Sequence, residues 1–424
     1  MIVSLLICIF TTVLLSAALS ASSVHRAFLF KLCAVQWLAL FLSLVYFNSS
    51  QPFTDGGDDW GYFALVISIS SFREAFDPYF YLGLLEQPGY PMLLAPFSFL
   101  SSGNLLALKA VNLSCFIVLT AVWSRVGHEL HGERFARVVG IFVALLAPLW
   151  YYAFFLLKDM PIATLQGVAV LGGVLICNRK LATGMLLVLI STVLLIPLRS
   201  FLALINIAIV GVSLLGMYRA ATRQRLHAGA SSKLLLAGGL LVGSAAAYAV
   251  LSGELIAYMG VLTETRKLSF ENIATQAEMR EADSMMRRAI FPILYFVSET
   301  AGIRALWLGS DQSSEVLRGL FAVPWILFYL PFLAVGIYFL MTRLRLSETR
   351  ASAWLPVISL GVIYMVVSWT GGDTTRWRLP DFPALATVAS LGFSQLQAKN
   401  RFLVLLWWSL AVLGSATIFY LILQ

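Results

Sequence analysis

The sequence contains few charged side chains for its length. Only 12% of the 424 residues are charged, whereas 60% are hydrophobic. Apolar runs of around 20 residues, each about the thickness of a bilayer, recur along the chain. A soluble protein could not bury that much apolar surface. The sequence therefore predicts an all-α, polytopic transmembrane helical bundle that forms a single integral membrane domain over residues 1–424.

Cysteine and histidine are scarce, and phosphate-binding loop motifs are missing. The four cysteines lie in or beside apolar runs without paired spacing, so neither disulfides nor a zinc site is expected. The four histidines fall in loops that we expect on the cytoplasmic side. No GxGxxG or GxxxxGK[ST] motif is present, which argues against a nucleotide cofactor. The net charge of +8 fits membrane topology better than a nucleic-acid partner.

The apolar runs predict about twelve membrane spans. The first resembles a signal peptide, but no Lys or Arg precedes it, and Arg26 and Lys31 follow it. We therefore expect it to be a retained span with its N-terminus outside. The predicted spans are residues 2–21, 32–48, 104–123, 138–156, 160–177, 183–198, 201–218, 234–252, 320–341, 353–369, 382–396 and 402–422.

The charges of the loops alternate along the chain. The expected inner loops hold more than half of the 29 basic residues but only three of the 21 acidic ones, Glu129, Glu133 and Glu348. This is the positive-inside pattern. It places two long segments outside, residues 49–103 and 253–319, both with short amphipathic helices. It also places an Arg-rich turn, residues 370–382, on the same side.

The first outer segment is unusually acidic. It holds six acidic residues, including the adjacent pair Asp58 and Asp59, which introduces an apolar stretch from Trp60. Such a pair is either a solvated turn that caps a helix or a site with a general base. The sequence leaves both interpretations open. The six residues are Asp55, Asp58, Asp59, Glu74, Asp77 and Glu86.

Four further outer features carry residues suited to a site. Pro88 to Pro91 predicts a rigid, irregular connection. Lys158 and Asp159 form either a salt bridge at a helix junction or a cation and a carboxylate over one cavity. Arg199, at the tip of the 183–218 hairpin, either extends to lipid phosphates or joins a site. Arg376 and Arg378 flank Trp377, and arginine pairs well with phosphate.

In their order, these motifs resemble the GT-C superfamily of polytopic glycosyltransferases, which includes protein O-mannosyltransferases and aminoarabinose transferases. The resemblance covers residues 45–180 and 370–395. It rests on the acidic pair, the Pro-rich turn and Ala110-Val111-Asn112, with Lys158-Asp159 and the Arg-aromatic-Arg segment further along. It implies an inverting transferase that moves a sugar from a polyprenyl-phosphate donor to a glycan, lipid or protein hydroxyl at the outer membrane face.

The resemblance also implies roles for single residues. Asp58 would deprotonate the acceptor, and Asp59 would orient it or bind a divalent cation, Mg²⁺ or Mn²⁺, together with Asp58. The growing negative charge on the carrier phosphate would be stabilised by cations. No nucleotide is required. The cations are Arg376, Arg378, Lys158 and Arg199, and the substrate-positioning residues are Tyr62, Glu86, Tyr90 and Asp159.

Two other functions fit parts of the sequence. A polysaccharide polymerase, as in O-antigen synthesis, would join oligosaccharide repeats linked to undecaprenyl pyrophosphate, and the basic residues of segment 253–319 would suit its larger donor. A lipid-linked glycan flippase or transporter would place charges near the middle of the bilayer and show two related halves, which the sequence lacks. The short inner loops favour a bacterial inner membrane with the site on its periplasmic side.

Overall fold

The fold is helical throughout the part of the chain that the structure describes. This computed structural model contains helices and no strand there, which confirms the predicted all-α class. Six helices are long and apolar enough to cross a membrane, or seven if one bent pair counts as a span. The chain is thus a helical integral membrane protein. The described residues are 2–50, 53, 58–69, 74, 89–199, 202–223, 323–343, 352–369 and 379–423.

Two predicted segments lie wholly outside these residues, the span at residues 234–252 and the long outer segment at residues 253–319. Most of the predicted Arg-rich turn at residues 370–382 lies outside them as well.

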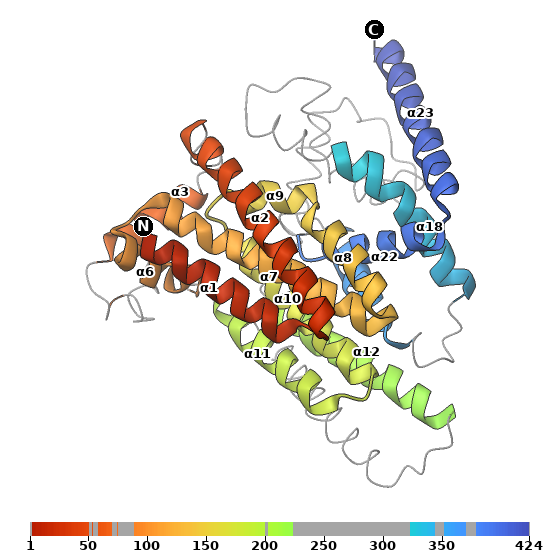
Figure 1. The fold of residues 1–424 in the computed structure, drawn as a ribbon, viewed down its shortest axis with the longest axis horizontal. Helices are drawn as coiled ribbons and strands as arrows, with labels where there is room; N and C mark the ends of the chain where they lie inside the picture. The colour runs from red at the N-terminus through yellow and green to blue at the C-terminus, as the bar shows by residue number, and fades with distance from the viewer. Residues whose placement is uncertain are drawn as a thin grey trace.

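Two buried helices form the centre of the bundle, α7 (Leu105–His131) and α10 (Asp159–Cys177). In the most apolar 18-residue stretch of each helix, 78% is buried in α7 and 89% in α10, compared with 22% in α1 (Ile2–Leu19). The hairpin of α1 and α2 (Ser23–Ser50) packs against α7, with the N-terminus beside α3 and α6 (Figure 1). The buried side chains of α1 are small, namely Ser4, Cys8, Thr12 and Ser16.

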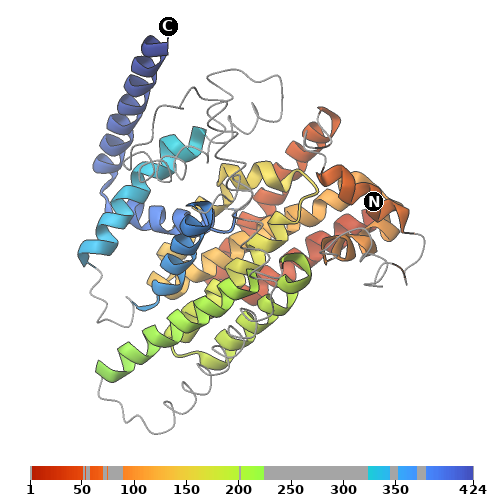
Figure 2. The same cartoon turned by 180° about the vertical axis from the view of Figure 1, so that it is seen from behind.

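A second hairpin, α11 (Leu181–Arg199) and α12 (Leu202–Arg223), covers α10 (Figure 2). A Cβ on Gly172 would lie 2.6 Å from the carbonyl oxygen of Gly184, so only glycine permits this approach of α10 and α11. Small residues at such contacts are typical of helix packing in membranes. The helices predicted at 160–177 and 183–198 are confirmed.

The span predicted at residues 138–156 is not a single helix. The chain there forms α8 (Glu133–Ala144) and α9 (Ala147–Ala153), which meet at an angle of 52°. Pro148 lies in the first turn of α9, where a helix does not need the missing N–H. The apolar run is continuous through the break, and therefore hydropathy alone does not reveal it.

The C-terminal helices pack against the same core, and α23 (Ala398–Leu423) does so beside η3 and α18 while its C-terminal end projects away from the bundle (Figure 1). A π-helical turn, η3 (Trp325–Tyr329), leads into α18 (Leu330–Arg343), which packs on α22 (Phe382–Gln395). The remaining helix, α20 (Leu355–Trp369), lies along α12.

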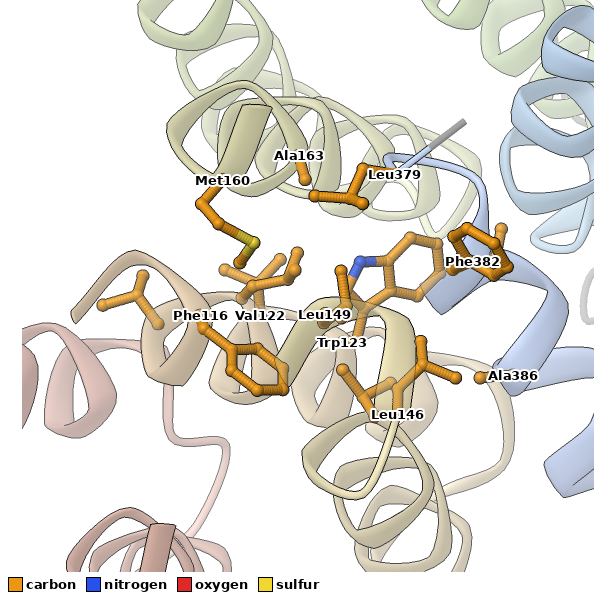
Figure 3. Packing of buried hydrophobic residues seen from close by; sticks show 14 of the residues in the cluster. Phe116, Val122, Trp123, Leu146, Leu149, Met160, Ala163, Leu379, Phe382 and Ala386 are labelled. Atoms are coloured by element: carbon orange, nitrogen blue, oxygen red, sulfur yellow. The ribbon is translucent and has the colours of Figure 1, made fainter. Parts of the chain in front are cut away.

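Figure 3 shows how the chain before and within α22 joins the central core. Side chains from this segment pack beside the indole ring of Trp123 on α7 and the α8–α9 corner. The buried residues in this contact are Leu379, Phe382 and Ala386 on one side and Trp123, Leu146 and Leu149 on the other.

Polar side chains gather at two opposite ends of the bundle. At one end, Glu129 of α7 accepts from Lys180 at 2.9 Å and from Asn178 at 3.1 Å. We call this the basic end. Twenty residues earlier on α7, about 30 Å away at 1.5 Å per residue, Lys109 lies at the other end, which we call the site end. The grouping of charges agrees with the alternation of charge between the loops.

Candidate functional site

The acidic pair opens helix α3 (Asp58–Ser68). Carboxylates are favoured in a first turn because the helix dipole is positive there. The helix begins at Asp58, two residues before Trp60, where the apolar stretch starts. Asp59, Tyr62 and Val66 share one face by their spacing, and Asp59 and Val66 are buried. Asp58 lies off that face and is exposed. Asp58 and Asp59 can therefore begin a helix and also contribute to a site.

The Pro-rich motif begins a helix rather than an irregular connection, so that prediction is wrong. Gly89 is the first residue of α6 (Gly89–Ser101), and Pro91 fits because first-turn N–H groups need no intrahelical acceptor. A Cβ on Gly89 would lie 2.7 Å from the backbone C and O atoms of Pro197. The glycine therefore lets α6 lie directly on the end of α11.

Tyr90 is fully buried beneath α3. Its ring packs edge-on against Tyr62, with 5.0 Å between centroids, and its hydroxyl donates to Oδ1 of Asn112 at 3.2 Å. Burial raises the pKa of Tyr90 well above its usual value, and the nearby carboxylate of Asp159 raises it further. The hydroxyl consequently remains protonated and available as a donor.

Lys109 places a positive charge inside the site end. The residue is 1% exposed, and its Nζ lies 5.8 Å from the ring centroid of Phe53 and 5.6 Å from that of Phe155. Asp59 is the carboxylate that acts electrostatically on it. An intramembrane cation is expensive unless it has partners. Asp59 and the two aromatic faces supply them here.

A second charge pair lies where α10 begins. Arg199, the last residue of α11, has Nη1 3.7 Å from Oδ1 of Asp159, the first residue of α10. The two side chains are only 11% and 2% exposed. Arg199 is therefore turned into the protein and does not extend to lipid phosphates. Lys158 precedes α10 as its N-cap residue and is half-buried.

The structure brings together most of the residues that the sequence suggested. They come from α3, α6, α10 and α11, which are widely separated in the chain, and meet around the start of α7. Glu86, Arg376 and Arg378 lie outside the described residues. The gathered residues are Asp58, Asp59, Tyr62, Tyr90, Lys158, Asp159 and Arg199.

The two adjacent carboxylates have different environments. Asp58 is exposed, whereas Asp59 is buried and faces Lys109. Within the described ranges, no three His, Cys, Asp or Glu side chains gather in a way that could hold a metal ion. The Mg²⁺ or Mn²⁺ role of Asp58 and Asp59 stays a prediction.

Sequence reasoning missed Lys109 and gave Asn112 no role. Lys109 could have been identified from the sequence, because it is a lone cation within the apolar run 104–123. Asn112 follows one helical turn later on the same face and is fully buried. Its partners come from distant segments, which no local pattern reveals.

Together these features define a helical integral membrane protein with a buried, charged site at one end of its bundle. The chain matches no protein-family model, and no curated protein matches it with significant similarity.

Proposed function

We propose that this protein is an inverting glycosyltransferase of the GT-C type, which moves one sugar from a polyprenyl-phosphate donor to a hydroxyl of a glycan, lipid or protein. The observation that carries the proposal is the convergence at the site end. Carboxylates and cations of four helices, α3, α7, α10 and α11, gather there, and the exposed Asp58 is next to the buried Asp59, on which Lys109 acts. This arrangement supplies a base and positive charge, the two requirements of glycosyl transfer from a phosphate.

The reaction is a single displacement. The acceptor oxygen forms a bond to the anomeric carbon as the bond from that carbon to the phosphate oxygen breaks. The electron pair of the breaking bond leaves with polyprenyl phosphate, and the acceptor proton passes to Asp58. Because Asp58 is exposed, it returns that proton to water.

Asp58 suits the role of base better than its neighbour. Its carboxylate is exposed and can meet an incoming hydroxyl. Asp59 is fully buried against Lys109, and a nearby cation makes a carboxylate a weaker base. Asp59 therefore orients the site, as the resemblance implies.

In this proposal the carrier phosphate is met by Lys109 and Arg199, two cations that are buried. Each already lies near a carboxylate, which keeps it in position before the donor arrives. Negative charge grows on the leaving phosphate during transfer, so preplaced cations favour the transition state. Lys158, Arg376 and Arg378 complete the proposed set.

The proposal includes a topology of twelve spans. The site end faces the extracytoplasmic side, and the protein resides in a bacterial inner membrane. The basic end, with Arg125 and Lys180, then lies in the cytoplasm, in keeping with the positive-inside rule.

The polymerase function remains an alternative that uses the same end of the bundle. Its distinguishing segment, residues 253–319, lies outside the described residues. The flippase is the weaker alternative. A transporter site is expected near the middle of the bilayer, whereas the described charge pairs lie at the helix ends.

The Asp58→Asn variant tests the assignment of the base. Transfer of radiolabelled sugar from the polyprenyl-phosphate donor should fall to background, while binding of the carrier lipid stays within about twofold of wild type, because the amide has the same shape but cannot take the proton. Full turnover by this variant would show that Asp58 is not the base.

A further inference from the structure

The amide of Asn112 joins three segments at the site end. Its Nδ2 donates to the carbonyl oxygens of Phe155 at 2.6 Å and Leu157 at 3.0 Å, and its Oδ1 accepts from the Tyr90 hydroxyl at 3.2 Å. The side chain is 0% exposed. Both N–H groups and the oxygen are thus used in one buried position.

The two carbonyl groups belong to the link between α9 and α10. This link, residues 154–158, is not helical, and four of its five side chains are almost fully buried. Buried backbone carbonyls need hydrogen-bond donors, and a non-helical segment does not supply them internally. Asn112 supplies two. The link leads directly into Lys158 and Asp159.

The third contact reaches the opposite wall of the site. Tyr90 lies in the first turn of α6, and its ring packs on Tyr62, one turn after Asp59 in α3. A shift of Asn112 would therefore move Asp58 and Asp59 of α3 relative to Lys158 and Asp159 at the start of α10.

We propose that Asn112 is a positioning residue, which fixes the start of α10, with Lys158 and Asp159, relative to α3 and α6. Its effect on turnover rests on the proposed glycosyl transfer, whereas its hold on the link 154–158 does not. Asn112 acts through its hydrogen bonds and need not touch the substrate.

A second buried asparagine provides a matched control. Asn206 is also 0% exposed, and its Nδ2 donates to Ser191 at 2.7 Å and Thr192 at 3.2 Å. Its acceptors are side chains of the regular helix α11. Asn112→Leu removes three buried hydrogen bonds and Asn206→Leu removes two, one of them part-buried, but only Asn112→Leu releases the link.

The decisive experiment is hydrogen–deuterium exchange on the full-length protein in lipid nanodiscs, for wild type, Asn112→Leu, Asn206→Leu and Tyr90→Phe. Asn112→Leu should speed exchange in peptides covering 154–159 by about tenfold or more, as expected for two lost hydrogen bonds. Asn206→Leu and Tyr90→Phe should leave those peptides unchanged. Equal exchange in Asn112→Leu and wild type would overturn the proposal.

Kinetics on the same samples test the link to catalysis. Asn112→Leu should lower kcat at least about tenfold with donor KM within about twofold, since misplaced groups cost rate more than binding, and Asn206→Leu should retain wild-type kcat. If Asn112→Leu loosens the link yet turns over normally, the positioning role fails and the transferase stands. If wild type shows no transfer, the transferase proposal fails, and the exchange result still decides whether Asn112 holds the link.

Discussion

Gly89 lies directly against the backbone of Pro197, with no room for a side chain between them. This contact joins two motifs that are distant in the sequence, the start of α6 and the end of α11. It places Tyr90 and Arg199, one and two residues further along their helices, at the same end of the bundle. The packing of a glycine thus shapes the charged site.

Replacing Gly89 by alanine should destabilise the protein. The new Cβ would meet the C and O atoms of Pro197 at 2.7 Å, and backbone atoms cannot move aside easily. We expect a loss of about 1–3 kcal/mol in the free energy of unfolding, measured by SDS titration in mixed micelles. The control is Gly61→Ala in α3, where a Cβ meets nothing within 4 Å. That change should be neutral or stabilise by up to about 1 kcal/mol. Equal losses in both variants would refute the close contact.

The pairing of Lys109 with Asp59 can be tested by a double-mutant cycle. Lys109→Met should leave a buried carboxylate without its cation and cost about 3–5 kcal/mol of stability. Adding Asp59→Asn should restore much of that loss, because the neutral amide needs no counter-charge. The same SDS titration gives all four values. Additive effects of the two substitutions would mean that the residues do not interact.

Arg199 should contribute to carrier binding. Arg199→Gln removes a charged donor and should weaken binding of polyprenyl phosphate about 10- to 100-fold, as for the loss of a charge-assisted hydrogen bond. Native mass spectrometry of the protein with added lipid measures the affinity. Arg137→Gln is the matched control, because its ion pair with Glu133 lies at the basic end. Unchanged affinity in Arg199→Gln would remove this residue from the phosphate site.

The orientation of the bundle can be measured by cysteine labelling. In a variant without native cysteines, Trp60→Cys should react with a membrane-impermeant maleimide added to intact cells. Arg137→Cys should react only after permeabilisation. Both positions are accessible, since Trp60 is 52% exposed and the Arg137 side chain 47%. The opposite pattern would place the site end in the cytoplasm and contradict the extracytoplasmic proposal.

The sequence predicted the helices best where one apolar run formed one helix. The run 160–177 became Asp159–Cys177, and 183–198 became Leu181–Arg199. Alternating loop charge also predicted that Asp59, Tyr90, Asp159 and Arg199 would share one end, because positive-inside topology fixes the ends of spans before any contact is known.

The remaining features depend on contacts between distant segments. The bend between α8 and α9 lies within a continuous apolar run, so hydropathy does not register it. The link that follows is held by Asn112, whose carbonyl partners lie more than 40 residues away in the chain. Lys109 was recognisable as a cation in a span, but its electrostatic interaction with Asp59 depends on the tertiary structure, which brings the first turn of α3 near Lys109.

Product analysis by mass spectrometry tests the central claim most directly. Purified wild-type protein would be incubated with an extracted pool of polyprenyl-linked sugars and candidate acceptors, with Asp58→Asn as the matched control. The account predicts an acceptor that gains the mass of one sugar, together with free polyprenyl phosphate, and no product from the variant. A ladder of multi-sugar increments would instead identify a polymerase. The absence of any new covalent product, with carrier lipid bound to the protein, would contradict the transferase.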